Sequence, residues 1–430
     1  MTDSSTIKSY KKFLVIWMGE LISSIGSGIT AFGLSVYMFQ TTGTATSVGI
    51  VTLCAFLPSV MLAPFAGALA DRMDRRLLMV LGDSLSAVGL VVLLILLFIG
   101  DPPAWQIYLC VGINSIFVSL LAPTYKATIT DLVEEKDFTK ASGMVQLADS
   151  SKYLLSPIIA GIILSFTDIK LILIIDICTI FITVITIMAV RKNLPKFTLK
   201  SHGEKTKISH DIRDGFMAIL ESKGVMTLVL IMSLVTFYVG FLQTLFKPML
   251  LVVTDETTLG MIESIGAIGM LVTSLVIGVV TLKRRYVSKI FMSMISAGVF
   301  VMLLGVCQSK WLIAGFGFMF FASLPLINTG TDFLIRRTVP NEKQGRVWGI
   351  ISVISQMGYI VAYCVAGVLA DYVFNPLLKE GGVLAGSLGQ VFGVGEGRGI
   401  GLLFAISGAL MILTALLIIS SKSVRRLDVE

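Results

Sequence analysis

The sequence has little charge. Charged residues make up 14% of the 430 residues, whereas hydrophobic residues make up 55%, and the mean hydropathy is +0.90. A typical soluble domain carries about 25% charged residues. The composition therefore excludes an ordinary soluble domain and predicts a polytopic membrane protein.

Histidine and cysteine are also scarce, with 2 and 5 residues, and every Cys falls within an apolar run. Neither a disulfide framework nor a zinc site is indicated. The sequence contains no G-x-x-x-x-G-K-[ST], no H-E-x-x-H and no G-x-S-x-G, which are signatures of ATP binding and of common catalytic sites. We therefore expect no cofactor, no bound metal and no enzymatic activity. The net charge of +7 is spread over short loops, so it predicts topology signals and lipid headgroup contacts, and no nucleic acid partner.

What the sequence does have is long apolar runs. Twelve runs are long enough to cross about 30 Å of hydrocarbon as helices, which takes about 20 residues. A basic stretch at 191–223 separates six of them from the other six. We expect an all-α fold in which two pseudo-symmetric six-helix bundles, at 1–190 and 224–430, are joined by a cytoplasmic linker. The runs are 13–38, 45–69, 77–99, 105–128, 141–166, 171–190, 225–253, 258–282, 287–307, 311–335, 347–374 and 399–420.

Loop charges predict the orientation. Lys and Arg gather in alternate loops, and the loops between them hold only Lys170, Lys310, Lys379 and Arg398. Because positive loops stay on the cytoplasmic side, both termini are expected in the cytoplasm. The first apolar run is too long for the core of a cleaved signal peptide, so we expect a retained first helix.

The stretch G-A-L-A-D-R-M-D-R-R at 67–76 lies between the second and third runs. Each of its charges would cost roughly 2.5 to 3.5 kcal/mol at the bilayer centre, so the stretch predicts a tight hairpin at the membrane face. Asp71 can accept hydrogen bonds from the open N-terminus of the eleventh helix, and Arg75 can reach Asp131. These contacts would form a conformational latch; the alternative is that the charges only set topology and cap turns. The latch residues are Gly67, Asp71, Arg72, Arg75, Asp131 and Arg346.

The same stretch resembles the G-x-L-A-D-R-x-G-R-R/K signature of the major facilitator superfamily, with Asp74 in place of the second Gly. D-L-V-E-E-K-D-F-T-K-A at 131–141 and V-P-N-E-K-Q-G-R-V at 339–347 are similar to the macrolide-efflux branch of its drug and proton antiporters. Residues 133–161 and 339–367 also share a Val, a Gly and an Ala-Gly pair in the same register, as expected of two related halves.

The resemblance implies a secondary transporter with the major facilitator fold. It implies proton-coupled efflux of a lipophilic or amphipathic compound by alternating access, hence multidrug resistance, from a bacterial cytoplasmic membrane. The expected partners are the small substrate, protons and membrane lipids, with the protein a monomer. The alternatives are export of an endogenous metabolite such as a siderophore or peptide, proton-coupled import, or a function of another class, as a lipid scramblase or membrane enzyme.

Ionisable residues inside the runs are candidates for proton coupling, because a charge there is costly. Glu20 is followed on one helical face by Ser24, which favours a cavity-lining acid, although a neutral Glu bonded to a neighbouring helix is equally compatible. Asp332, one turn from Asn328, is a second candidate. Asp149 is a third, with Lys152 close enough on its helix to form a structural ion pair instead.

Four other ionisable residues are assigned to the ends of their helices. Asp83 and Asp176 lie near helix ends, so a hydrated or capping role is expected. Lys247 and Glu263 are expected to extend towards the membrane surface.

The resemblance also implies that the first, fourth, seventh and tenth helices line a central cavity. Each contains a polar residue at depth, and the substrate-cavity candidates are Glu20, Ser24, Asn114, Gln243 and Asn328. Pro157 and Gly161 match part of the antiporters' G-P-x-x-G-G motif on the fifth helix and allow close helix packing. The glycine-rich loop at 375–398 is expected to be a flexible or re-entrant outer flap.

Overall fold

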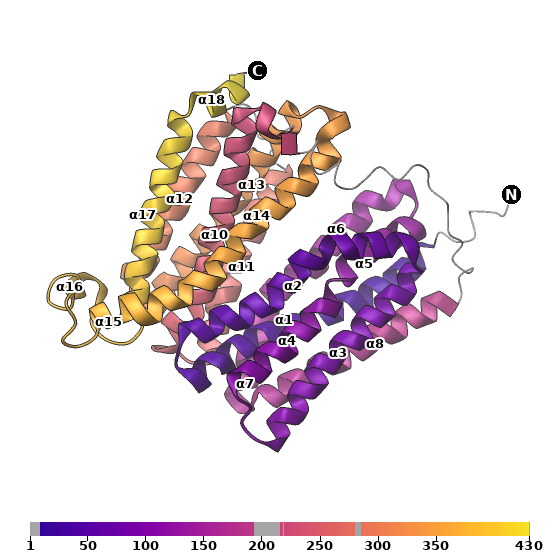
Figure 1. Ribbon diagram of the computed structural model, residues 1–430, viewed down its shortest axis with the longest axis horizontal. Coiled ribbons are helices and arrows are strands. Elements are labelled where there is room, and N and C mark those ends of the chain that lie inside the picture. The colour runs from indigo at the N-terminus through magenta and orange to yellow at the C-terminus, as the bar shows by residue number, and fades with distance from the viewer. Residues whose placement is uncertain (1–8, 193–215, 218, 280–284, 430) are drawn as a thin grey trace. The chain divides into compact units, whose positions relative to one another are not determined.

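The computed structural model describes residues 9–192, 216–217, 219–279 and 285–429 (Figure 1). Its first half contains α1 (Tyr10–Thr42), α2 (Ala45–Arg72), α3 (Arg75–Ile99), α4 (Ala104–Val118), α5 (Leu121–Leu132), η2 (Glu135–Asp137), α6 (Phe138–Leu154), α7 (Ser156–Phe166) and α8 (Ile169–Lys192). Its second half contains α10 (Lys223–Leu251), α11 (Glu256–Val279), α12 (Tyr286–Val306), α13 (Lys310–Thr338), α14 (Asn341–Leu369), η3 (Ala370–Phe374), α15 (Asn375–Leu378), α16 (Gly389–Phe392), α17 (Arg398–Ser420) and α18 (Lys422–Val429).

Twelve helical segments in this described part are long and apolar enough to cross a membrane. They correspond one to one with the twelve expected runs, which confirms the all-helical, twelve-span fold. Three spans contain an interruption that hydropathy does not show, and in the eleventh it is the π-helical η3 between α14 and α15. The fourth is divided into α4 and α5, and the fifth into α6 and α7, with Pro157 near the start of α7. Proline lacks the N–H that would continue the preceding helix, so it explains the break in the fifth span.

The chain divides into two compact units. The first unit comprises Met1–Gly43, Ile50–His202 and Asp255–Met261, and the second comprises Thr44–Gly49, Gly203–Thr254 and Ile262–Glu430. Helix α2 therefore begins in the second unit and continues in the first, while α11 does the reverse. The linker expected at 191–223 lies largely outside the described residues.

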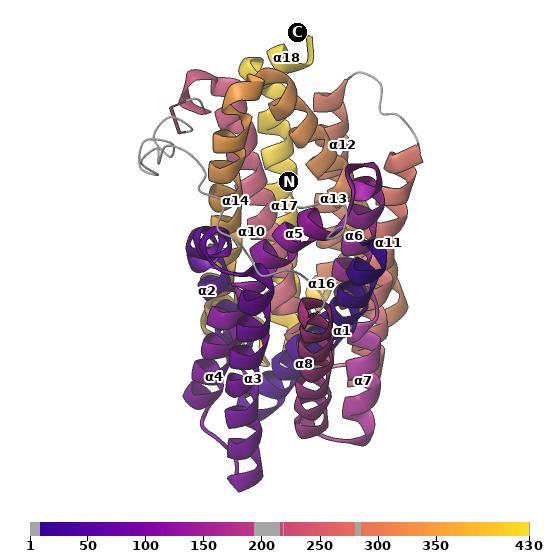
Figure 2. The same cartoon turned by 90° about the vertical axis from the view of Figure 1, so that its right-hand side faces the viewer.

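In the first unit, α8 lies between α1 and α3 and packs against both. Helix α3 also packs against α4 and α5, and α1 against α6 and α7; Figure 2 shows α3 and α4 side by side. A buried cluster that includes Phe13, Trp17, Met79 and Tyr125 joins α1, α3 and α5. Helix α8 therefore contacts both α1 and α3.

Helix α1 ends at a glycine. Gly43 follows α1 in the left-handed conformation, with φ 66°, and its N–H donates to the Phe39 carbonyl at 2.8 Å. A residue without a Cβ adopts this conformation freely, so Gly43 ends the helix and turns the chain towards α2.

In the second unit, α12 packs against α17 through two reciprocal glycine pairs. A Cβ on Gly305 would meet the carbonyl oxygen of Gly401, and a Cβ on Gly401 would meet that of Gly305. Gly298 and Gly408 oppose each other in the same way two turns along. Small residues let membrane helices approach until their backbones touch, which replaces the hydrophobic driving force that lipid does not provide.

The glycine-rich loop is folded, so the expectation of a flexible flap is wrong, and a re-entrant position stays a prediction. Leu378 of α15 and Phe392 of α16 are buried against Leu402 of α17. The Gly395 N–H donates to the Leu378 carbonyl at 3.0 Å, and Gly397 adopts the left-handed conformation directly before α17. In Figure 1 the loop lies at the N-terminal end of α17. The buried side chains Leu378 and Phe392 hold this loop, and their role was not predicted because glycine dominates the sequence around them.

Enlarging a glycine of the α12–α17 contact is expected to destabilise the protein. Gly401→Leu should lower the unfolding free energy by about 1–3 kcal/mol, because the new side chain meets backbone that cannot move aside. Thermal unfolding of the purified protein in detergent would measure the loss. Gly315→Leu on α13 is the matched control, since a Cβ there meets nothing within 4 Å. Equal stability losses in the two variants would contradict this packing argument.

Candidate functional site

The charged hairpin joins α2 to α3 through Asp74. The Asp74 carboxylate accepts a hydrogen bond from the Arg76 N–H at 3.1 Å and thereby caps α3. It also forms an ion pair with Arg191 of α8, at 3.3 Å. In the sequence motif, Asp74 stands in place of a glycine. An acid directly before a helix is a recognisable N-cap signal, but its pairing with the end of α8 depends on tertiary structure.

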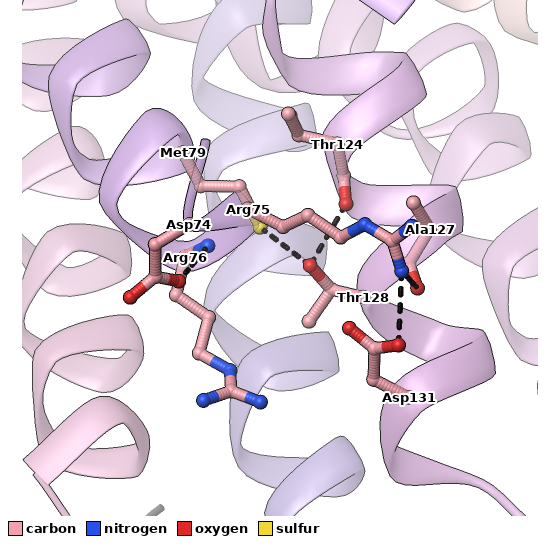
Figure 3. Close-up of polar contacts among 8 residues, drawn as sticks. All are labelled: Asp74, Arg75, Arg76, Met79, Thr124, Ala127, Thr128 and Asp131. Atoms are coloured by element: carbon pink, nitrogen blue, oxygen red, sulfur yellow. Dashed lines mark hydrogen bonds and ion pairs between the residues drawn. The ribbon is translucent and has the colours of Figure 1, made fainter. Parts of the chain in front are cut away.

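Arg75 binds the end of α5, as expected. Its Nη1 lies 2.9 Å from Asp131 Oδ1 and donates to the Ala127 carbonyl at 3.2 Å (Figure 3). Figure 3 shows the guanidinium group extending from α3 towards both acceptors. Charge-assisted hydrogen bonds of this kind are shorter and stronger than neutral ones, so Arg75 fixes the hairpin to α5.

The remaining latch residues cannot be described at the level of side chains. The side chains of Gly67, Asp71, Arg72 and Arg346 lie outside the described residues. A contact of Asp71 with the start of the eleventh span therefore stays a prediction.

Asp371 is a functional candidate that the sequence analysis missed. Within the second unit, its carboxylate accepts hydrogen bonds from the Ala45 N–H at 3.1 Å and the Thr46 N–H at 2.7 Å, and from the Thr46 hydroxyl at 2.6 Å. It thus caps the start of α2, where free N–H groups and the helix dipole favour an anion. The signal was present in the sequence, because G-V-L-A-D at 367–371 repeats the G-A-L-A-D of 67–71.

The substrate-cavity candidates occupy different environments. Glu20 and Ser24 are half-buried on α1, and Asn328 is exposed on α13. The Asn114 side chain donates to the Ser86 carbonyl at 3.0 Å, and Gln243 accepts from the Tyr363 hydroxyl at 2.8 Å. Asn114 and Gln243 therefore already have structural partners, whereas Glu20, Ser24 and Asn328 present accessible polar groups.

The expected ion pair between Asp149 and Lys152 is not formed. Asp149 is exposed on α6. It lies within electrostatic range of Lys126 on α5 and of Lys152, but it forms no direct ion pair with either lysine. The three-residue spacing of Asp149 and Lys152 on one helix allows an ion pair, but the two side chains do not meet. Asp332, another coupling candidate, is half-buried on α13 and within electrostatic range of Arg336.

The hydrated or capping role expected for Asp83 and Asp176 is wrong. Each is only 2% exposed, inside α3 and α8 respectively. Asp74 caps α3 instead of Asp83. Distance from a helix end did not predict hydration here, because neighbouring helices cover both side chains.

Lys247 and Glu263 do not extend separately towards the membrane surface. Lys247 Nζ lies 3.1 Å from Glu263 Oε1, and the side chains are 14% and 20% exposed. The ion pair joins α10 to α11 within the second unit. Mutual neutralisation satisfies both charges inside an apolar bundle, which is the usual condition for charges at such depth.

The fifth-span motif contributes to close packing within the first unit. Gly161 of α7 opposes the Glu256 carbonyl at the start of α11, and the Pro157 carbonyl opposes Gly260. The Thr257 hydroxyl donates to the Gly161 carbonyl at 3.2 Å. A larger side chain at Gly161 or Gly260 would separate α7 from this part of α11.

Comparisons with known proteins agree on one family. The family model described as Major Facilitator Superfamily matches residues 16–253. Macrolide efflux protein A of Streptococcus pyogenes is 26% identical over 429 residues, covering 97% of this chain and 98% of that protein. The staphyloferrin A transporter of Staphylococcus aureus is 25% identical over 323 residues, covering 71% of this chain and 73% of that protein. The crystal structure of the nucleoside transporter NupG superposes with a TM-score of 0.72 at 14% identity, covering 96% of this chain and 100% of that one, and shows a shared fold.

Removing the negative partner of Arg75 is expected to loosen the hairpin. Asp131→Asn should lower the unfolding free energy by about 1 kcal/mol, because the charge-assisted bond becomes a neutral one. Thermal unfolding in detergent would measure the change. Asp101→Asn, at an exposed loop position between α3 and α4, is the control and should change stability by less than about 0.5 kcal/mol. A shift in Asp131→Asn no larger than in this control would show that the bond does not stabilise the hairpin.

Proposed function

Because this chain belongs to the Major Facilitator Superfamily of secondary transporters, we propose that it exports lipophilic or amphipathic compounds in exchange for protons. The observation that carries the proposal is the similarity to macrolide efflux protein A, which extends over nearly the full length of both proteins. Transport by this superfamily requires no ATP site or catalytic cluster, in keeping with a sequence that offers neither.

Acidic side chains within the spans support coupling to protons. Glu20 on α1 and Asp332 on α13 are half-buried, and Asp149 on α6 is exposed without a direct ion pair to a described residue. A carboxyl group at membrane depth is costly to keep charged, so it favours binding a proton when it loses contact with water. Release of that proton in another conformation would link substrate movement to a proton gradient.

The hairpin supports a switching role. Arg75 and Asp131 fix the start of α3 to α5, so the hairpin moves with the first unit as a rigid piece. We propose that the latch formed around this hairpin must open during each transport cycle. Both termini and the hairpin are proposed to face the cytoplasm, which follows from the distribution of Lys and Arg.

A second candidate is export of an endogenous metabolite. The staphyloferrin A transporter is similar to about 71% of this chain, which favours a siderophore among such metabolites. The two candidates differ in the substrate and share the transport mechanism, so a ligand screen separates them. A thermal-shift screen of the purified protein should show stabilisation by macrolides in the first case and by siderophores in the second.

The transport reaction itself can be tested in proteoliposomes. A fluorescent lipophilic cation should move across the membrane only while a proton gradient is imposed, and a protonophore should abolish the movement. Dye movement of equal rate without a gradient would contradict proton coupling and favour passive passage, as expected of a scramblase.

Glu20 has a separate test in the same vesicles. Glu20→Gln removes the ionisable group but keeps the side-chain size, so gradient-driven transport should fall at least tenfold while ligand-induced thermal stabilisation persists. Glu135→Gln, at an exposed position in η2, is the control and should transport normally. Undiminished gradient-driven transport in Glu20→Gln would exclude this residue from coupling.

A further inference from the structure

Four carboxyl side chains from four helices form a row inside the first unit. They are Asp149 of α6, Glu20 of α1, Asp83 of α3 and Asp176 of α8. Glu20 lies within electrostatic range of Asp149, and Asp83 lies within range of both Glu20 and Asp176. Asp149 is exposed, Glu20 is half-buried, and the last two are 2% exposed. The row therefore leads from the surface of the unit into its interior.

The inner end of the row has no matching positive charge. Among the residues that the structure describes, no Lys, Arg or His forms a direct ion pair with Asp83 or Asp176. Lys152 acts on Asp176 only from a distance, and Lys126 and Lys152 face Asp149 at the outer end. Helices α4 and α7, which also belong to this unit, contain no acidic or basic residue. An unpaired ionised carboxylate at such a place costs several kcal/mol, and a bound proton removes that cost.

Polar atoms without partners lie along the same row. The Tyr125 hydroxyl of α5 is 5% exposed, lies within range of Glu20 and Asp149, and has no hydrogen-bond partner among the described residues. Asp83 Oδ2 also has no hydrogen-bond partner among the described residues. Buried polar atoms are nearly always hydrogen-bonded in native proteins. These unsatisfied atoms mark positions at which a proton or a hydrogen-bonded water can be accommodated.

Contacts around Asp176 show how closely α8 and α1 meet at this point. The Thr179 hydroxyl donates to the Asp176 backbone carbonyl at 2.7 Å and lies 3.5 Å from Asp176 Oδ1. A Cβ on Gly26 of α1 would collide with the Thr179 hydroxyl and would lie 2.9 Å from Asp176 Oδ1. The Thr30 hydroxyl of α1 is buried beside the same carboxyl. Glycine at position 26 thus lets α1 approach Asp176 and Thr179 of α8 closely.

We propose that Asp149, Glu20, Asp83 and Asp176 form a proton-transfer row, with Asp83 and Asp176 as its storage end. The members lie within electrostatic range of one another, and no direct hydrogen bond joins two of them among the described contacts. In each step the proton leaves the carboxyl group of one member, is passed on by a hydrogen-bonded water or hydroxyl, and binds the carboxylate of the next, so one acid is deprotonated as its neighbour is protonated. The Tyr125 hydroxyl is placed to pass a proton between Asp149 and Glu20. This inference rests on the proposed coupling of transport to protons.

Infrared difference spectroscopy of the purified full-length protein tests the storage end directly, because the C=O stretch of a protonated carboxyl group is separate from that of a carboxylate. At neutral pH, Asp83→Asn and Asp176→Asn should each lose part of the protonated-carboxyl band. Asp101→Asn, which removes an exposed loop acid, should leave the band unchanged, and Asp83→Glu should retain it. Asparagine fits the aspartate site without a buried charge, so both variants are expected to fold.

Two results would overturn the proposal. One is a band of wild-type size in both Asp83→Asn and Asp176→Asn. The other is loss of the wild-type band on adding NaCl at constant pH, which would identify a sodium ion as the occupant. The infrared result is independent of the transport assay. Loss of the protonated-carboxyl band in the variants supports the proton-transfer row even where dye movement needs no gradient. Gradient-driven dye movement with an unchanged band refutes the row and leaves the proposed function intact.

Discussion

The cost of an uncompensated charge in a hydrocarbon environment is the constraint on which this structure depends. In the second unit the constraint is met by pairing. Lys247 and Glu263 neutralise each other at 3.1 Å, and the Asp371 carboxylate is held by the free N–H groups at the start of α2. Each of these charges is balanced by a fixed partner, so none of them needs to exchange a proton.

The first unit meets the same constraint in one way at the hairpin and in another way in its interior. At the hairpin, Asp74 and Asp131 have basic partners, Arg191 and Arg75. In the interior, Asp83 and Asp176 are more deeply buried than either hairpin acid and have no such partner among the described residues. A fixed partner makes an acid structural, whereas its absence leaves protonation as the means of neutralisation. The difference separates acids that hold the fold from acids suited to exchange.

The sequence predicted what depends on composition along the chain. The twelve spans follow from apolar length, and the Arg75–Asp131 contact follows from a motif at a membrane face. Burial of a side chain depends on which helices pack together, and the sequence alone did not predict that packing. Asp83 and Asp176 were placed near hydrated helix ends, yet α8 packs against α1 and α3 and encloses both. Lys247 and Glu263 lie on different helices, so no argument based on one helix could predict that their side chains pair across α10 and α11.

The choice of carboxyl groups at the interior of the first unit is itself informative. A buried amide could form comparable hydrogen bonds without the risk of an unpaired charge. Replacing buried ion pairs by uncharged residues often leaves stability unchanged or raises it. A carboxyl group differs from an amide in having a second protonation state close in free energy. At Asp83 and Asp176 the property that distinguishes the acid from asparagine is therefore the ability to bind and release a proton. Glu20, half-buried between them and the exposed Asp149, is the member through which that proton can reach water.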